Sequence, residues 1–284
     1  MPTIESGTLY VVATPIGNLS DVSLRALEVL SKVSCIAAED TRHTRKLLNY
    51  HGVSNHLTAL HEHNEDRASD ALLDKCINGD DIALVSDAGT PIVSDPGQHL
   101  VSRAHDKGIP VVPVPGCSAA LAALSVCGMQ AERFVFEGFL PARSARRAKR
   151  LQTLSSETRL MIFYEAVHRV PDFLRELHKH FGGQRKACVA RELTKQFETI
   201  RRLPLSDLVS YYDEYPDELR GEFVVLVEGA VADDSGTAVS ADHVLHCLLQ
   251  EVSPSKAASI AAKITGMRKS ELYKKALTKS NEAS

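Results

Sequence analysis

Two adjacent carboxylates, Glu39 and Asp40, follow the short apolar segment Cys35–Ala38. That segment predicts a buried strand, so both side chains are expected where a strand ends. A carboxylate can accept a proton from a substrate, but it is a weak base at neutral pH unless burial or a like-charged neighbour raises its pKa. The candidate bases are Asp40, Glu39, Glu165, Glu192, His61 and Lys195. Asp40 would need burial or a like-charged neighbour such as Glu39, and a lysine would need a lowered pKa. Positioning of substrate and capping of a helix that begins at Thr41 are the alternative roles of Asp40.

Three segments rich in Gly, Pro and Ser also follow predicted strands, namely Thr14–Asn18, Ser86–Gly97 and Pro115–Ala119. In an open parallel sheet, ligands bind outside the carboxyl ends of the strands, and small residues let the backbone approach a ligand. No Gly-x-Gly-x-x-Gly follows the first strand and no Gly-x-x-x-x-Gly-Lys-Ser/Thr occurs, so the dinucleotide fingerprint and the P-loop are excluded. For any one loop, the alternative is a turn without a ligand.

Five of the eight residues from Arg143 to Arg150 are basic, and no acidic residue lies between Glu137 and Glu157. In a chain with a net charge of −3, such a basic patch is expected to contact RNA phosphates. The alternative is a solvated helix face. The candidate RNA-binding residues are Arg143, Arg146, Arg147 and Arg150, together with Arg42 and Arg45, which follow the carboxylate pair.

Apolar segments and helical patterns alternate along the first half of the chain, which predicts an α/β fold with a parallel sheet. The expected strands are 9–13, 35–38, 82–85 and 111–114, and the expected helices are 23–33, 41–51, 67–77, 98–107 and 118–126. The second half has predicted strands at 134–136, 160–164, 188–190, 198–200 and 223–227, with fewer helices between them. A mixed sheet is therefore expected there.

Breaks in these patterns predict three regions. They are 1–128, an N-terminal α/β domain with a parallel sheet; 129–232, a C-terminal α/β domain with a mixed sheet; and 233–284, a linker and small helical region. The linker is the polar segment Ala230–Thr237. In the tail, Ser253 and Pro254 predict the start of a helix and Gly266 its end. From Ser253 onward the tail has seven Lys/Arg and two Glu. Its basic residues either bind phosphates or form a solvated helix face.

The composition, 44% hydrophobic and 24% charged over 284 residues, is typical of soluble globular proteins of two domains. No segment approaches the roughly 20 apolar residues that cross a bilayer, and the N-terminus does not resemble a signal peptide, so we expect a cytoplasmic protein without membrane contact. The six cysteines form no Cys-x-x-Cys pair, which argues against a zinc site or a disulfide framework. His61 and His63 would share one face of a strand, but no third ligand is identifiable and no metal is expected.

The loops at the strand ends, taken together and in this order, resemble the tetrapyrrole methylase family, a class of S-adenosylmethionine-dependent methyltransferases. The resemblance covers about residues 8–230 and is closest to the ribosomal branch of that family. Its motifs are Ala13–Leu19, Ala38–Arg42, Ser86–Pro91 followed by Ser94–Gly97, and Arg191–Lys195. The porphyrinogen-modifying branch usually has Gly-Asp-Pro where this chain has Ser86-Asp87-Ala88, which counts against a tetrapyrrole substrate.

The resemblance implies the two-domain class III methyltransferase fold, with S-adenosyl-L-methionine in the cleft between the domains and a small C-terminal helical appendix. It also implies that a homodimer methylates the ribose 2′-hydroxyl of a decoding-centre cytidine in 16S rRNA, as free rRNA or in the small ribosomal subunit, without a metal. Asp40 takes the position of a proton-accepting carboxylate. The cofactor-binding residues implied by position are Pro15, Val85, Ser86, Asp87, Thr90, Ser118, Ala119, Glu165 and Arg191.

Two other functions stay open. The same fold methylates tetrapyrroles, although the basic segment 143–150 is unexpected beside a porphyrin cleft. A non-catalytic protein that binds RNA or a nucleotide would keep the pocket without turnover. Transfer of a labelled methyl group to ribosomal particles separates this last function from the enzymes.

Overall fold

The computed structural model describes residues 6–61, 64–231 and 241–282 of the chain. Its contacts form a larger unit that ends at Ala230 and a smaller unit that begins at Val231. The three domain ranges expected from the sequence, 1–128, 129–232 and 233–284, stay predictions. Most of the expected linker, residues 232–237, lies outside the described residues.

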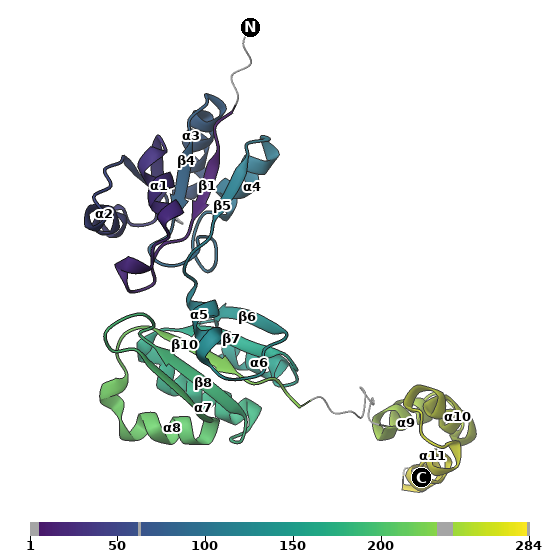
Figure 1. The fold of residues 1–284 in the computed structure, drawn as a ribbon. Coiled ribbons are helices and arrows are strands. Elements are labelled where there is room, and N and C mark those ends of the chain that lie inside the picture. Colours follow the sequence, from purple (N-terminus) through teal and green to yellow (C-terminus); the bar gives the residue numbers. More distant parts are fainter. Residues whose placement is uncertain (1–5, 62–63, 232–240, 283–284) are drawn as a thin grey trace. The chain divides into compact units, whose positions relative to one another are not determined.

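The larger unit contains two five-stranded sheets (Figure 1). The first consists of β1 (Leu9–Val12), β2 (Cys35–Ala38), β3 (Leu57–Ala59), β4 (Ile82–Val85) and β5 (Val111–Val114). Its order is β3-β2-β4-β1-β5 and every pair is parallel, which confirms the predicted parallel sheet. The strands therefore all end on the same side, and the loops after β1, β2, β4 and β5 start close together. β5 is an outer strand and contains Pro113.

Helices cover both faces of this sheet. Neighbouring residues of a strand point to opposite faces: Cys35 packs with α3 and α4, whereas Ile36 packs with α1 and α2. Because both faces are buried, the strands are nearly continuous apolar segments, which made them recognisable in the sequence. The helices are η1 (Leu19–Asp21), α1 (Leu24–Lys32), α2 (Thr41–Tyr50), α3 (Glu65–Ile77), α4 (Gln98–Asp106) and α5 (Ala119–Val126).

The second sheet consists of β6 (Phe134–Phe139), β7 (Leu160–Glu165), β8 (Lys186–Arg191), β9 (Thr199–Pro204) and β10 (Phe223–Val227). Its order is β6-β7-β10-β8-β9, with β6 parallel to β7 and the other pairs antiparallel, so the predicted mixed sheet is confirmed. Helices are fewer here than along the first sheet, as expected, although their bounds were not predicted. The structure has α6 (Ser144–Leu154), η2 (Val167–Arg169), α7 (Val170–Phe181), α8 (Leu205–Glu214) and η3 (Pro216–Glu218).

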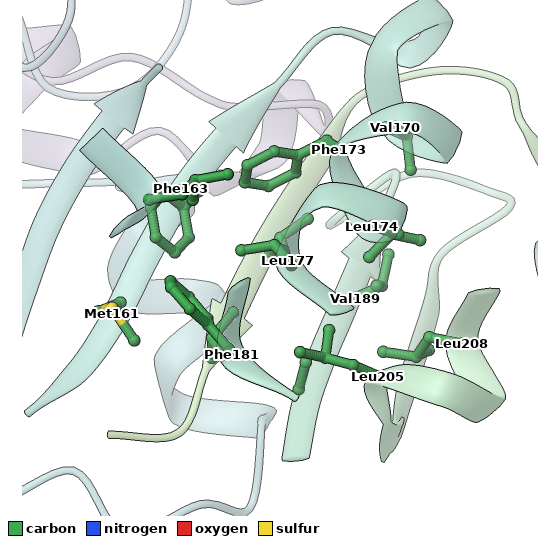
Figure 2. Close-up of a cluster of buried hydrophobic side chains, with 14 of the residues drawn as sticks. Met161, Phe163, Val170, Phe173, Leu174, Leu177, Phe181, Val189, Leu205 and Leu208 are labelled. Atoms are coloured by element: carbon green, nitrogen blue, oxygen red, sulfur yellow. The ribbon is translucent and has the colours of Figure 1, made fainter. Parts of the chain in front are cut away.

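Helices α6, α7 and α8 bury one face of the second sheet. Figure 2 shows the cluster beneath them, in which the ring of Phe163 from β7 meets that of Phe173 from α7 edge to face at 5.4 Å. The opposite face packs against α5 through Leu160, Ile162 and Cys188. Helix α5 thus follows the last strand of the first sheet but packs on the second sheet.

Strand β6 contains a bulge. Its pairing with β7 shifts by one residue between Phe136 and Gly138, so Glu137 is an extra residue and Phe139 lies opposite Tyr164. A shift of one residue moves every later side chain to the other face of a sheet. Gly138 has a φ of +60°, a conformation that glycine adopts without a steric penalty.

The smaller unit is a three-helix cluster of α9 (Ala241–Leu249), α10 (Pro254–Thr265) and α11 (Lys269–Glu282). Ser253 precedes α10 with an extended backbone, Pro254 is its first residue, and Gly266 ends it with a φ of +70°, as the sequence predicted. The helices bury a small core that includes Leu245, Ala258 and Leu272. Among the described residues of the whole chain, no helix combines the length and apolar character that a membrane span needs.

Candidate active site

A cavity of about 380 Å³ lies at the carboxyl ends of the first sheet's strands, against one face of the second sheet. Its size lies within the range of about 300–1,000 Å³ that is usual for small-molecule sites. The first half of the chain supplies Ile16, Glu39, Asp87–Thr90, Val93–Asp95, Ser118 and Ala119. The second half supplies Phe139, Tyr164–Val167, Ala190, Leu193 and Gly221–Val224.

The lining of this cavity is acidic. Its charged residues are Glu39, Asp87, Asp95, Glu165 and Glu222, and the described part of the lining includes no Lys, Arg or His. A site with charge of one sign attracts a ligand of the other sign, most strongly where water is excluded. The cavity therefore favours a cationic ligand and disfavours one that places a phosphate inside it.

Three of these carboxylates, Glu39, Asp87 and Asp95, form a cluster on the loops after β2 and β4. Burial raises the pKa of Glu39, with the charges of Asp87 and Asp40 adding to the rise against a hydrogen bond from the Asp87 backbone. Burial likewise raises the pKa of Asp95 to about 6, against a hydrogen bond from Ser86 and with Glu39 and Asp87 adding to it. Glu39 and Asp95 are thus better proton acceptors near neutral pH than ordinary carboxylates.

Glu165, at the end of β7, is a buried carboxylate with spare hydrogen-bonding capacity. Its Oε1 accepts a hydrogen bond from the Ala166 N–H at 2.9 Å and lies 3.1 Å from Nε of Arg169. Its Oε2 is buried without a hydrogen-bond partner. The Glu165 side chain has no exposed surface, so this unpaired oxygen costs free energy and is closed to a ligand.

Hydrogen bonds hold several parts of the cavity wall in place. Thr90 Oγ1 donates to the Cys117 carbonyl at 3.0 Å, and the Tyr164 hydroxyl accepts from the Ala120 N–H at 3.1 Å. Thr14 and Gly89 exchange backbone hydrogen bonds of 2.9 and 3.0 Å. The loops after β1, β4 and β5 are thereby fixed to one another and to β7.

The segment 92–97 is strained. Ile92 and Ser94 have φ values of +76° and +69°, a region that costs of order 1–3 kcal/mol for residues other than glycine. The segment ends at Gly97, whose N–H donates to Glu65 Oε1 at 3.0 Å. This anchored loop presents Asp95 to the cavity.

A second cavity, of about 200 Å³, adjoins the first and shares Ile16, Asp87, Ala88 and Glu222 with it. It contains three residues expected in the site, Pro15, Ser86 and Lys195. The proposal that Lys195 has a lowered pKa is wrong. Burial alone would lower it, but hydrogen bonds to Glu192 and Glu222, at 2.8 and 3.0 Å, outweigh burial and raise the pKa of Lys195.

The expected cofactor-binding residues are therefore only partly brought together. The first cavity is lined by Asp87, Thr90, Ser118, Ala119 and Glu165. Val85 is buried in the core of the first sheet, where its side chain reaches neither cavity. The Nε of Arg191, at the end of β8, donates to the Arg220 carbonyl at 2.8 Å, and this residue also lines neither cavity.

Asp40 lies beside the first cavity but does not line it. It caps α2, where its Oδ1 accepts from the Arg42 N–H at 2.8 Å, and its carboxylate also accepts from the Arg42 guanidinium at 2.7 Å. The hydrogen bonds from Arg42 hold the pKa of Asp40 well below its usual range. The raised pKa that Asp40 would need as a base is therefore not found. Arg42 is engaged with this carboxylate, and Arg45 donates to the Asn55 carbonyl at 3.2 Å.

The basic segment 143–150 is divided by the pairing of two of its arginines with acidic residues. Arg147 is buried and its Nη2 donates to Glu176 Oε1 at 2.9 Å, while Arg150 binds both carboxylate oxygens of Glu137 at 2.7 and 2.9 Å. Both acids lie outside the segment in sequence and reach it through the fold. Arg143 and Arg146 are exposed.

The described residues hold no cluster of three or more His, Cys, Asp or Glu side chains arranged for a metal ion. Of the histidine pair, only His61 is described; Glu62 and His63 lie outside the described residues. The sequence assigned no role to Asp95 or Phe139, although both line the first cavity. Asp95 lies in a loop that was already singled out, whereas the bulge that moves Phe139 to the cavity face had no signal in the sequence.

The arrangement of the larger unit is that of the class III methyltransferases. The methyltransferase CobJ has a TM-score of 0.60 at 23% identity, covering 79% of this chain and 95% of its own. Diphthine synthase has a TM-score of 0.60 at 14% identity, covering 78% and 90%. A uroporphyrin-III C-methyltransferase from Thermus thermophilus, complexed with S-adenosyl homocysteine, has a TM-score of 0.56 at 16% identity, covering 78% and 97%.

Sequence comparison identifies the family. Residues 8–209 match the tetrapyrrole (corrin/porphyrin) methylases, and residues 235–280 match the RsmI C-terminal HTH domain. Proteins named ribosomal RNA small subunit methyltransferase I are 50% identical in Pseudomonas aeruginosa, covering 99% of this chain and 100% of the relative, and 48% identical in Escherichia coli O157:H7, covering 96% of each. The chain belongs to the tetrapyrrole methylase family, in the branch of these ribosomal RNA small subunit methyltransferase I proteins.

The raised pKa of Asp95 predicts a pH dependence of stability. Its value in the fold, about 6, lies above the ordinary 3.8, so the stability that Asp95 contributes below 3.8 is lost as the pH rises through about 6. Urea unfolding at about pH 4 and about pH 7 should show a larger loss for the wild type than for Asp95→Asn. Asp74→Asn, an exposed position on α3, is the control and should follow the wild type. Equal pH dependence in the wild type and Asp95→Asn would contradict the burial of this charge.

Proposed function

We propose that this chain transfers the methyl group of S-adenosylmethionine to the 2′-hydroxyl of a decoding-centre cytidine in 16S rRNA. The names of its relatives support a small-subunit rRNA substrate, and the family resemblance supports the 2′-hydroxyl and the cytidine. A protein that modifies ribosomal RNA acts in the cytoplasm, on free rRNA or on the small subunit.

The acidic cavity is the observation that carries the cofactor assignment. S-adenosylmethionine has a sulfonium and an ammonium group, and the carboxylates of the lining suit both cations. A nucleoside phosphate as regulatory ligand fits this lining poorly, because the described lining offers its phosphates no basic side chain.

When bound, S-adenosylmethionine supplies an activated methyl group. The chain must then hold the ribose hydroxyl in line with that group and accept its proton. Glu39 suits the second task, because it lines the cavity and burial raises its pKa. Asp40 suits the role of positioning Glu39. Its N–H donates to Asp87 Oδ1 at 2.9 Å and its carboxylate caps the start of α2, so the adjacent Glu39 is held in place.

Glu39→Gln tests the proton acceptor. The change keeps the size of the side chain and removes the base, so kcat should fall by about 100-fold or more, with the Kd of S-adenosylmethionine within a few-fold. Asp40→Asn preserves the helix cap, so its kcat should fall much less than that of Glu39→Gln. Methyl transfer to small subunits under single-turnover conditions measures both. A normal kcat for Glu39→Gln together with a large loss of kcat in Asp40→Asn would make Asp40 the proton acceptor and Glu39 the positioning residue.

The substrate assignment is tested by mass mapping of 16S rRNA from cells that lack the chain. One ribose methylation in the decoding centre should disappear, and the purified chain should restore it on small subunits from those cells. An unchanged set of ribose methylations would refute the assignment. Transfer to a tetrapyrrole instead of to ribosomal particles would establish the alternative enzyme.

The pairing of the basic segment revises its role in RNA binding. Arg143 and Arg146 are exposed and remain the proposed phosphate contacts, whereas Arg147 and Arg150 are occupied by Glu176 and Glu137. This basic surface also favours RNA over a tetrapyrrole as substrate. Arg42 and Arg45 lie on α2, where they bind Asp40 and the Asn55 carbonyl, and they carry no part of this proposal.

Replacing Arg143 and Arg146 by Ala should weaken RNA binding and reduce its salt dependence, by about one unit of the logarithmic slope per lost contact. Thermal stability should stay within about 0.5 kcal/mol of the wild type. Arg147→Ala should instead lower the free energy of unfolding by about 3 kcal/mol, because Glu176 loses a largely buried partner. Filter binding to 16S rRNA and urea unfolding measure the two effects. Unchanged RNA affinity in the double variant would exclude this surface.

We also propose that the chain is a homodimer. Leu121 and Val126 of α5 are exposed apolar residues, and so is Ile200 of the outer strand β9. Ile200 lies opposite Ala190, on the face of the second sheet that packs against α5. Exposed apolar surface of this kind is typical of protein interfaces. Light scattering should give twice the chain mass of 31.0 kDa; a monomer mass at working concentration would contradict the proposal.

A further inference from the structure

Phe139 is an exposed aromatic side chain in the wall of the acidic cavity. Its relative exposure is 55%, although it is the last residue of a strand in a packed sheet. Its ring lies edge to face with that of Tyr164, with 5.6 Å between the ring centroids. A phenylalanine left half-exposed forgoes part of the stabilisation that its burial would contribute, so a face left open at a ligand site invites a functional explanation.

The bulge in β6 is what brings Phe139 to this wall. With regular alternation, Phe139 would share the face of Val135, which packs under α6 and α7. The extra residue Glu137 moves Phe139 to the opposite face, beside Tyr164. Gly138 makes the bulge possible and fits closely against the neighbouring loop, since a Cβ there would lie 3.1 Å from Ser94 Oγ.

The chain after Phe139 is fixed from two sides. Arg169 donates to the Leu140 carbonyl at 3.0 Å, and Leu140 itself is buried. Arg147 donates to the Ala142 carbonyl at 3.1 Å while it holds Glu176. An exposed side chain on a backbone fixed in this way is held ready for a ligand, so little conformational entropy is lost when the ligand binds.

We propose that Phe139 is the stacking platform for the target nucleobase, which leaves its own stack and lies on the phenylalanine ring while its ribose enters the cavity. This inference rests on the proposed function. A duplex or stacked strand would keep the 2′-hydroxyl away from a site that lies inside a cavity, and enzymes that act on one nucleotide usually extrude it. Aromatic rings are the usual partners of single unstacked bases in RNA recognition.

The surroundings of Phe139 suit a nucleotide. Arg143 and Arg146, exposed at the start of α6, follow Phe139 by four and seven residues and can meet the phosphates on either side of the target. The carboxylates Glu39 and Asp95 line the same cavity, where the ribose hydroxyl must lose its proton. Phe139 contributes no hydrogen-bonding group, so it positions the base without reading its identity.

Substitutions of Phe139 test the platform, with methyl transfer to small subunits from cells that lack the chain as the assay. Phe139→Ala should lower kcat/KM for the subunits by about 5- to 150-fold, the effect of losing one base–aromatic stack. Phe139→Trp should keep activity within a few-fold, because a larger aromatic face remains. Phe139→Leu should behave like Ala, because it restores apolar volume without an aromatic face.

The matched control is Phe134→Ala at the other end of β6. Phe134 is 40% exposed and lines neither cavity, so its loss should leave kcat/KM near the wild-type value. The Kd of S-adenosylmethionine, measured by calorimetry on each variant, should stay within about two-fold of the wild type.

Three results would overturn the proposal. A parallel loss of S-adenosylmethionine affinity in Phe139→Ala would make Phe139 a wall of the cofactor site. Full activity in Phe139→Leu would show that Phe139 contributes only apolar volume and no aromatic face. Normal kcat/KM in Phe139→Ala would leave it without a role in positioning. Failure of the proposed function itself is distinct, because the wild type would then methylate no ribosomal particle.

Discussion

The site depends on keeping like charges close together at the end of a parallel sheet. Glu39 and Asp87 follow two neighbouring strands, β2 and β4, so the topology itself brings them together. The negative charges of Glu39 and Asp87 repel each other. Hydrogen bonds from the Asp40 N–H to Asp87 and from the Asp87 backbone to Glu39 oppose that repulsion. The strained segment that carries Asp95 adds a third charge. The protein therefore holds, at a cost in its own stability, a concentration of negative charge that a cationic ligand relieves.

The parallel sheet could be predicted because its strands are buried on both faces and appear in the sequence as short continuous apolar segments. The helices of the second half were missed although their signal was present: Val170, Phe173, Leu174 and Leu177 follow helical spacing and all pack into one cluster. The bulge in β6 was beyond prediction. It depends on one unpaired residue, and the alternation of side chains along six residues is too short to reveal it.

The ionic part of the site was predicted less well, because its ion pairs join residues both near and far in sequence and depend on how the fold places them. Arg147 binds Glu176 of α7 and Lys195 binds Glu222 near β10, and neither acid lies in the segment that suggested the role. Asp40 was placed at the right strand end, yet its nearest cation, Arg42, lies only two residues away and lowers its pKa. Spacing predicts which residues meet at a strand end. The protonation of those residues depends on partners that only the fold supplies.

The outer strand β5 has a consequence for the behaviour of the chain in a crowded cell. Backbone groups of Pro110 and Val114 face β1, where they accept hydrogen bonds from Leu9 and Ala13, so those of Pro113 face away from the sheet. A proline there removes a donor from the open edge, and the opposite edge, β3, is only three residues long. Strands as apolar as these would otherwise be templates for aggregation. The sheet can thus present its loops at one end while neither of its sides readily recruits another strand.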